Sequence, residues 1–277
     1  MENNRLFTFG CSFTNYNWAT WADIIGGEFL YYQNWGVRGA GNHCIFNSII
    51  ECNQRNCFSK DDTIAIMWSG ITREDRYINN RWLTGGNVYN NRFYNEDFVK
   101  KYVDNRGFLI RDMAFIKATI DLLDHWGVKY IMFSMIPLNA INDNNFIQIT
   151  AENNDVLELY NDTIKLIRPS VYEVIFNSNW TSRTTKIDRT RYDNICKKSW
   201  PTYQDYLEGK NIPELDLKEI IHYETIGRDP HPSPIEHLEY LSKVYPEFNI
   251  SQRTIDIINA DRYNAKVRPE SKIITRF

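Results

Sequence analysis

Short apolar runs along the chain alternate with stretches in which apolar residues recur at helical spacing. Five runs have the length and composition of strands: 6–9, 29–34, 63–68, 129–136 and 172–176. Helical spacing predicts helices over 18–25, 42–53, 108–126 and 155–167. Strands that alternate with helices in this way are typical of a parallel sheet covered on both faces, so we expect an α/β fold.

Two stretches interrupt this alternation: 77–104 and 177–216. Both are polar and rich in aromatic residues, and loops of such length in compact domains usually have a function. We expect one domain over 1–277, with both stretches inserted over the active-site edge. Their aromatic side chains suit stacking against sugar rings, and packing onto the domain is an equally good interpretation.

Composition excludes several classes of protein. The 277 residues carry a net charge of −3 and no basic stripe, which argues against binding to nucleic acid. No apolar run approaches the length of a membrane span, and the polar N-terminus passes directly into the first strand, so we expect no signal peptide and no membrane partner. The five cysteines lack metal-type pairing and indicate free thiols in a reducing compartment. Without a signal peptide or a membrane span, we expect a cytoplasmic or virion-associated protein, and the abundance of Asn, Ile, Tyr and Lys favours a bacterial or phage origin.

The first candidate for chemistry is a serine directly after the first apolar run. Residues 10–14 read Gly-Cys-Ser-Phe-Thr, a small-residue break that ends a buried strand in a tight turn. A turn of this kind presents a nucleophile at the carboxyl edge of a sheet, which makes Ser12 the candidate nucleophile. Two alternatives stand beside it: Ser12 as the N-cap of the first helix, and the neighbouring Cys11 as the nucleophile.

The best partners for this serine lie near the other end of the chain. His231 can take the hydroxyl proton at neutral pH, and Asp229 can hold its other ring nitrogen. A simple turn between two prolines is the alternative interpretation of His231. The backbone amides of Ser12 and Gly39 can stabilise an oxyanion, although Gly39 also suits a tight turn. The other four histidines show no metal-ligand spacing, so we expect no metal.

Three short motifs resemble sequence blocks of the SGNH (GDSL-like) hydrolase family. Residues 10–14 are similar to its first block, with Cys11 where Asp is usual, residues 34–39 to its second and residues 229–233 to its last. The resemblance implies a flavodoxin-like three-layer α/β/α sandwich around a parallel sheet of five strands. It also implies serine esterase or lipase chemistry without a cofactor or metal. The oxyanion hole would be shared by the serine amide, a glycine amide and an asparagine side chain.

The chain departs from the family pattern in the third block, which lacks the usual asparagine. Residues 68–75 read Trp-Ser-Gly-Ile-Thr-Arg-Glu-Asp. We expect Ser69 or Asn42 to supply the missing donor, with strand-end hydrogen bonding and helix capping as their alternatives. The same stretch holds Arg73, which either pairs with Asp75 or another local acid, or binds an anionic substrate.

The acid of the last block is also displaced. Family members carry it three residues before the histidine, where this chain has Arg228. Asp229 is one residue closer to His231 and can reach it through a bent turn, and Glu224 is a further candidate.

These motifs together predict a serine esterase that acts on a small-molecule or carbohydrate ester through an acyl-enzyme intermediate. An O-acetylated carbohydrate is the first substrate to consider, because of the aromatic insertions. One alternative is a catalytically silent member of the fold that binds glycans or has a structural role. Another is a flavodoxin-like phosphate or nucleotide binder that uses residues 10–14 as an anion loop, although that loop has no lysine.

Overall fold

The computed structural model describes residues 5–89, 93–138, 153–177 and 231–260. The chain divides into two compact units. The first unit consists of Met1–Ile175 together with Pro232–Phe277, and the second unit is Phe176–His231. Most of the second unit lies outside the described residues, and with it nearly all of the predicted insertion 177–216 and Asp229. The fold described below is therefore that of the first unit, and one domain over 1–277 stays a prediction.

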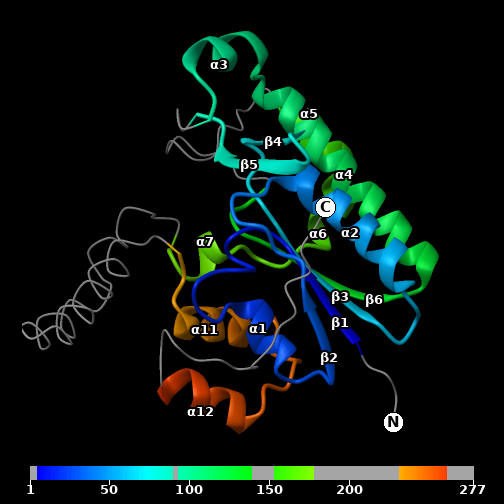
Figure 1. Ribbon diagram of the computed structural model, residues 1–277, viewed down its shortest axis with the longest axis vertical. Coiled ribbons are helices and arrows are strands. Elements are labelled where there is room, and N and C mark those ends of the chain that lie inside the picture. Colours follow the sequence, from blue (N-terminus) through cyan, green and yellow to red (C-terminus); the bar gives the residue numbers. More distant parts are fainter. Residues whose placement is uncertain (1–4, 90–92, 139–152, 178–230, 261–277) are drawn as a thin grey trace, which may run out of the picture. The chain divides into compact units, whose positions relative to one another are not determined.

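A parallel sheet forms the centre of the first unit (Figure 1), with its strands in the order β2-β1-β3-β6. The strands are β1 (Arg5–Phe9), β2 (Tyr31–Asn34), β3 (Thr63–Trp68) and β6 (Lys129–Ser134). They coincide with four of the five predicted runs. Phe9 pairs with Ile66, so β1 and β3 end at the same edge of the sheet. A single parallel bridge from Met132 to Ile167 continues the sheet beyond β6, where a fifth parallel strand would pair.

The fifth predicted strand, 172–176, is helical at its start. Helix α7 spans Val171–Val174 and begins with a capping box. The Glu173 amide donates to the Ser170 hydroxyl (3.2 Å), and the Ser170 amide donates to the Glu173 carboxylate (2.9 Å). Two backbone donors at the helix start are satisfied in this way, which outweighs the preference of Val and Tyr for strands. The prediction of a strand here is therefore wrong.

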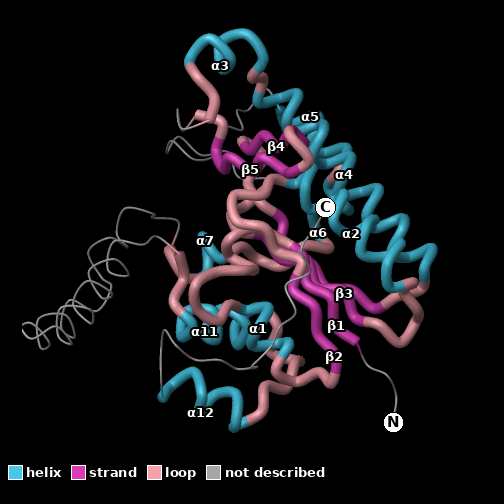
Figure 2. The backbone as a smooth tube through the Cα atoms, viewed as in Figure 1, coloured by secondary structure: helices cyan, strands magenta, loops and turns pink. Residues whose placement is uncertain are grey.

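Helices lie on both faces of the sheet (Figure 2). Besides α7, the described part of the first unit contains α1 (Trp21–Gly26), α2 (Asn42–Asn56), α3 (Glu96–Tyr102), α4 (Asn105–Trp126), α5 (Asn154–Leu159), α6 (Asn161–Lys165), α11 (Pro234–Val244) and α12 (Gln252–Ala260). The four predicted helices are present, although 155–167 is divided into α5 and α6 at Tyr160. In the described residues, none of the helices combines the length and the apolar character that a membrane crossing requires.

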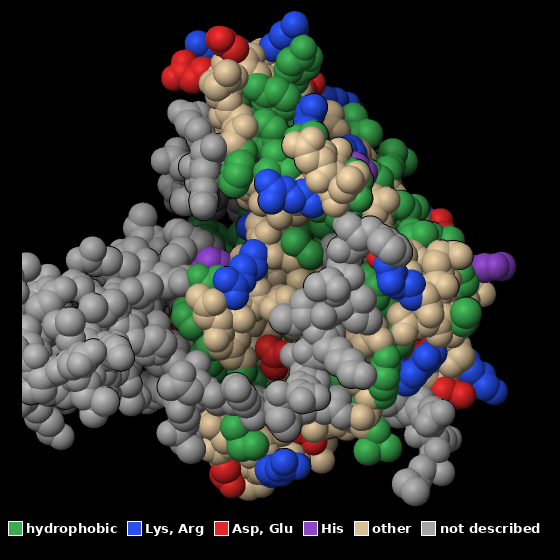
Figure 3. Space-filling view, viewed as in Figure 1, with side chains coloured by type: hydrophobic (Ala, Val, Ile, Leu, Met, Phe, Trp, Pro, Cys, Tyr) green, Lys and Arg blue, Asp and Glu red, His purple; other side chains and the backbone are tan. Residues whose placement is uncertain are grey.

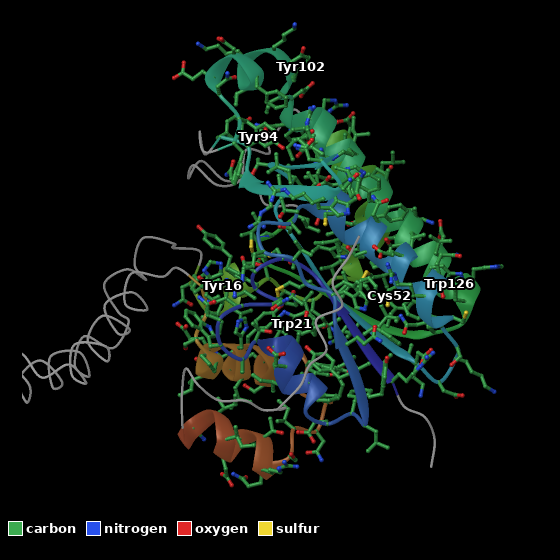
Figure 4. All side chains as sticks on the ribbon, in the orientation of Figure 1. Tyr16, Trp21, Cys52, Tyr94, Tyr102 and Trp126 are labelled. Carbon is green, nitrogen blue, oxygen red and sulfur yellow. The ribbon has the colours of Figure 1, made fainter. Side chains whose placement is uncertain are left out.

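Ring contacts define the two helical layers. On one face Phe133 of β6 contacts Trp21 of α1 and Tyr240 of α11, with ring centroids 5.0 and 5.8 Å apart. On the other face Phe58, which follows α2, contacts Phe7 of β1 (4.9 Å) and Trp126 at the end of α4 (5.7 Å). Trp21 and Trp126 lie on opposite sides of the strands in Figure 4. The predicted three-layer α/β/α sandwich is thus confirmed.

The first insertion, 77–104, has regular structure that the sequence pattern did not indicate. β4 (Arg73–Ile78) and β5 (Arg81–Asn87) form an antiparallel hairpin, and α3 follows. The hairpin turns at Asn79 and Asn80, whose φ angles are 51° and 60°. Asn tolerates this left-handed backbone better than most residues, and such turns match the twist of paired strands.

Aromatic residues of this insertion are partly packed and partly exposed. Tyr94 is buried, stacks on Phe98 (4.7 Å) and donates its hydroxyl hydrogen to the Glu74 carbonyl. The side chains of Tyr77 and Tyr102 are instead 52% and 59% exposed. Tyr94 and Tyr102 are labelled in Figure 4. On the face drawn in Figure 3, Lys and Arg side chains are dispersed among other types. Packing therefore explains Tyr94, while the exposed rings remain available to a ligand.

Candidate active site

Ser12 lies in a hydrogen-bonded turn directly after β1. The Cys11 carbonyl accepts from the amides of Thr14 (3.0 Å) and Asn15 (3.1 Å), and Ser12 itself is 7% exposed. Helix α1 begins only at Trp21, with Thr20 as its N-cap. The interpretation of Ser12 as the N-cap of the first helix is therefore wrong.

Glycine is required before this turn by a close approach to β3. A β-carbon on Gly10 would lie 2.0 Å from the Thr14 hydroxyl oxygen and 2.9 Å from the Met67 carbonyl oxygen. Both distances are shorter than any ordinary contact of a carbon atom, so only glycine lets the turn fold back over the end of the neighbouring strand. The glycine thus fixes where Ser12 is presented.

The loop after β2 is tied to the turn that holds Ser12. The Val37 amide donates to the Gly10 carbonyl (2.9 Å), and the Asn34 amide group donates to the Thr14 carbonyl (2.8 Å). The side-chain oxygen of Asn34 accepts in turn from the Gly36 amide (2.9 Å). A buried side chain that is satisfied on both sides in this way holds the two loops in one geometry.

Gly39 occupies a tight turn and leaves its amide available. The Ala40 amide donates to the Val37 carbonyl (3.0 Å), and Gly39 has a φ of +77°, as the third position of a type II turn requires. A β-carbon there would lie 2.3 Å from the Thr84 carbonyl oxygen on the β4–β5 hairpin. The Gly39 amide donates to no acceptor among the described residues. The turn role and the predicted donor role are therefore compatible.

Ser69 follows β3 and is fully buried. Its backbone is held on both sides by one side chain: its amide donates to Asn42 Oδ1 (2.8 Å), and its carbonyl accepts from Asn42 Nδ2 (3.0 Å). Its hydroxyl group has no hydrogen-bond partner in the part of the chain that the structure describes. A buried hydroxyl without a partner is unfavourable, so a ligand oxygen that accepted from it would be bound well.

Asn42 is the first residue of α2, and Gly41 is the N-cap. Besides the Ser69 carbonyl, its amide group donates to Asp112 Oδ2 (2.8 Å), so both of its hydrogens are used. The Asp75 carboxylate accepts instead from the Gly41 and Cys44 amides at the helix start (2.9 Å each). Asn42 therefore neither caps the helix nor, in this geometry, offers a hydrogen to an oxyanion. It positions Ser69.

Asp112 is a functional candidate that the sequence reasoning missed. The carboxyl group is fully buried in α4 and accepts from Arg111 Nε (2.8 Å) as well as from Asn42. Burial raises its pKa to about 7, against the opposing effects of Arg111 and Asn42. The signal was present: Asp112 interrupts the apolar stripe of its helix, one turn from Phe108 and one from Ile116.

Arg73 does not form the predicted ion pair with Asp75 or another local acid. Its guanidinium donates from Nη1 to the Ala40 carbonyl (2.8 Å) and from Nη2 to Met135 Sδ (3.4 Å). The same sulfur accepts from Cys11 Sγ (3.7 Å). Burial raises the pKa of Asp75, and the positive charge of Arg73 only lessens that rise. The structure thus leaves Arg73 without a carboxylate partner among the described residues.

Cys11 points away from the surface. It is fully buried, while the adjacent Ser12 is 7% exposed. Its thiol contacts Met135 in the interior of the unit. A nucleophile must meet its substrate, so this burial favours Ser12 over Cys11.

His231, the predicted base, lies at the boundary between the two units of the chain. It is the last residue of the second unit, and Asp229 lies outside the described residues. Pro232 belongs to the first unit, where its carbonyl accepts from Trp18 Nε1 (2.7 Å). Ser233 then caps α11 through a capping box with Glu236. The chain that directly follows His231 is therefore fixed to the loop between Ser12 and α1.

The described residues hold no group of three or more His, Cys, Asp or Glu side chains that could bind a metal ion. What they hold at the carboxyl ends of the strands is a set of donors: the Gly39 amide, the Ser69 hydroxyl and the Arg73 guanidinium. Donors without matching acceptors suit an oxygen that carries negative charge.

No protein-family model matches the chain, and a search of curated proteins also finds no match. Among solved structures the chain is similar to a proposed lipolytic protein of the G-D-S-L family from Desulfitobacterium hafniense, with 13% identity, a TM-score of 0.35, and coverage of 62% of this chain and 79% of that one. A proposed acylhydrolase from Bacteroides fragilis has 17% identity and a TM-score of 0.32, over 61% and 67% of the two chains. A variant of an acetyl-xylooligosaccharide esterase from Geobacillus has 13% identity and a TM-score of 0.38, over 64% and 83%.

Proposed function

We propose that the chain is a member of the SGNH (GDSL-like) hydrolase family and cleaves carboxylic esters with Ser12 as its nucleophile. The observation that carries the proposal is the turn of Ser12, which is fixed to the Gly39 loop by the Val37–Gly10 hydrogen bond (2.9 Å). A serine at the carboxyl edge of a parallel sheet, on a turn bound to a loop whose glycine amide has no acceptor in the described residues, suits acyl transfer.

In the proposed reaction Ser12 Oγ attacks the ester carbonyl while His231 takes the hydroxyl proton. The carbonyl oxygen becomes the oxyanion, and the amides of Ser12 and Gly39 donate to it. His231 then gives its proton to the leaving alcohol as the carbon–oxygen bond breaks. Water attacks the acyl-enzyme by the same route and releases the acid and Ser12. Asp229 would orient His231 and stabilise its positive charge.

Ser69 takes the place of the missing family asparagine in this proposal. Its hydroxyl is buried and has no acceptor in the described residues, and Asn42 holds its backbone in place. Asn42 thus contributes by positioning Ser69 rather than by direct contact with the oxyanion. No cofactor or metal takes part.

An O-acetylated carbohydrate is the first substrate that we propose to test. The exposed rings of Tyr77 and Tyr102 on the first insertion can stack on sugar faces. The substrate would be a small molecule or a carbohydrate ester in either case.

Labelling with a fluorophosphonate probe tests the nucleophile. The wild-type protein should form a covalent adduct on Ser12, which mass spectrometry of peptides can locate. Ser12→Ala should take up no label and lose nearly all hydrolysis of short-chain acyl esters and acetylated glycans, while its circular dichroism and melting temperature stay unchanged. Cys11→Ala is the matched control, because it removes the neighbouring thiol and should keep both label and activity.

The second candidate function is a catalytically silent glycan-binding or structural module. It is favoured by one observation, namely that Asn42 uses both of its amide hydrogens within the fold. The same labelling separates the two functions. A folded wild-type protein with no adduct on Ser12 and no esterase activity would establish the silent module and overturn the hydrolase.

A further inference from the structure

We propose that Arg73 binds an anionic group of the substrate, so that the preferred ester carries a carboxylate or another oxyanion. This inference rests on the proposed function and adds the charge of the substrate to it. It begins from a partly buried guanidinium that forms no ion pair with a carboxylate among the described residues. Burial of a cation without an anion is unfavourable, so such a group indicates a site that is completed by a ligand.

The nearby acids are already engaged with other partners. Glu74 pairs with Arg111 (2.9 Å) and Arg76 (3.3 Å). The Asp75 carboxylate accepts from backbone amides at the start of α2 and forms no ion pair within the described residues. Its charge acts on Arg73 only through space. Within the described part of the chain, the positive charge of Arg73 is therefore left without a hydrogen-bonded anion.

The position of the guanidinium places it at the same edge as the proposed nucleophile. Nη1 is bound to the carbonyl of Ala40, the residue after Gly39. Nη2 contacts Met135 Sδ, and the thiol of Cys11, the residue before Ser12, contacts the same sulfur. The guanidinium and the nucleophile turn thus share a contact with one methionine sulfur. An anion bound there would belong to a part of the substrate a few atoms away from the ester carbonyl.

The remaining donors of the guanidinium fit this type of ligand. Arginine has five N–H groups in a planar fork. Its two contacts, to the Ala40 carbonyl and to Met135 Sδ, leave three N–H groups without an acceptor in the described part of the chain. A carboxylate accepts two parallel hydrogen bonds from such a fork, which makes it the best match in geometry as well as in charge.

Two other roles are distinguishable from this one. If Arg73 donated directly to the tetrahedral oxyanion, its loss would lower kcat on every ester. If Arg73 only held the Ala40 carbonyl, its loss would lower the stability of the protein and affect all substrates equally. An anion-binding role predicts instead a rise in KM that is confined to charged esters.

The experiment compares matched esters in four proteins: wild type, Arg73→Gln, Arg73→Lys and Arg76→Gln. One pair of substrates is 4-nitrophenyl butyrate and 4-nitrophenyl hemisuccinate, which differ by a carboxylate on the acyl side. The other pair is acetylated methyl glucoside and acetylated methyl glucuronide, which differ by a carboxylate on the alcohol side. Arg76 is the control, because it lies on the same strand, is exposed and pairs with Glu74.

Wild type should prefer the charged ester in at least one pair. Arg73→Gln should raise KM for that ester by about tenfold with kcat nearly unchanged, and should leave the neutral ester within about twofold. Arg73→Lys should keep part of the preference, and added salt should reduce it in wild type. Equal effects of Arg73→Gln on both members of both pairs would overturn the inference.

A binding measurement keeps this test separate from the proposed function. Calorimetric titration with succinate and with methyl glucuronide should show binding of one of them to wild type and to Ser12→Ala, and binding about tenfold weaker to Arg73→Gln. If no ester is cleaved but this difference is found, Arg73 is an anion-binding residue and the hydrolase proposal fails. If esters are cleaved and neither acid binds more tightly to wild type than to Arg73→Gln, the inference is wrong and the hydrolase proposal stands.

Discussion

Asn42 binds both the amide and the carbonyl of Ser69, at 2.8 and 3.0 Å. One side chain at the start of α2 thereby continues the hydrogen bonding of β3 past its last residue. Asp112 accepts the other amide hydrogen of Asn42 and fixes the orientation of that amide group. Three fully buried residues from two helices and a strand end thus define where the Ser69 hydroxyl lies.

The first prediction concerns this link. Asn42→Ala removes two hydrogen bonds to Ser69 and leaves the buried Asp112 without one of its donors. We expect a loss of about 2–4 kcal/mol in the free energy of unfolding, because buried polar groups are left unsatisfied. Urea denaturation of both proteins measures it. If Ser69 is an oxyanion donor, kcat on a neutral ester should fall as well.

Asn47→Ala is the matched control for this variant. Asn47 lies on the same helix, and among the described residues its amide group donates to the His43 carbonyl of its own helix alone. Its removal should cost less than about 1 kcal/mol and leave kcat unchanged. Equal stability losses in the two variants would show that the contact with Ser69 has no special weight.

The second prediction follows from the pKa of Asp112, which burial raises from 3.8 to about 7. Between these two values the unfolded chain has lost the proton while the folded protein keeps it. The folded state therefore binds more protons, and the contribution of Asp112 to stability is present below about pH 4 and is lost as the pH rises to about 7. Asp112→Asn cannot titrate and should lack this change.

The difference in unfolding free energy between wild type and Asp112→Asn isolates the titration of Asp112 from that of all other groups. Urea denaturation at several pH values from 4 to 8 gives a curve for wild type and a curve for Asp112→Asn. The stability of wild type relative to the variant should fall across this range and level off above pH 7. Parallel curves would mean that Asp112 ionises in the folded protein much as it does in the unfolded chain.

Much of the layered fold could be predicted from the sequence, because strands and helices of this chain carry local periodicity. The run 63–68 and the stripe from Phe108 to Trp126 are continuous patterns, and β3 and α4 follow them closely. The strand predicted at 172–176 failed because a capping box at Ser170 decided the local structure. The β4–β5 hairpin was missed because its strands alternate weakly and are largely polar.

The site was predictable only in part, for a related reason. Ser12 and Gly39 lie in turns whose residue types are visible in the sequence. The link from Asn42 to Asp112 joins residues 70 positions apart, and no local pattern specifies such a contact. The expected partner of Arg73, Asp75, binds helix amides instead, which depends on where α2 begins in space. Asp229 lies outside the described residues, and its role stays a prediction.

The third prediction tests the turn at Gly39. Gly39→Ala adds a carbon 2.3 Å from the Thr84 carbonyl oxygen in a residue with a φ of +77°. We expect a loss of about 2–3 kcal/mol in stability, since strain and a backbone clash act together. Any rearrangement moves the Gly39 amide, so kcat on a neutral ester should fall by about tenfold or more.

Gly86→Ala separates strain from collision. Gly86 has a similar φ of +73°, but nothing lies within 4 Å of the position of an added carbon. It should cost only about 1 kcal/mol and leave kcat unchanged. Thermal melts and kinetics of both variants provide the comparison. The prediction fails if Gly86→Ala is as harmful as Gly39→Ala in either measurement.

The fourth prediction concerns the hydroxyl group of Ser69, and it separates a role in folding from a role in catalysis. The hydroxyl is buried and has no partner in the described residues, so Ser69→Ala breaks no hydrogen bond that the structure shows. We expect an unchanged or slightly raised melting temperature, because an unsatisfied buried group is removed. If the hydroxyl donates to the oxyanion, kcat should nevertheless fall by about 10²-fold, with little change in KM.

Ser48→Ala is the contrasting control. The buried hydroxyl of Ser48 donates to the Cys44 carbonyl, so stability should fall in this variant while kcat stays the same. A Ser69→Ala variant that is destabilised yet fully active would show that Ser69 acts in folding alone.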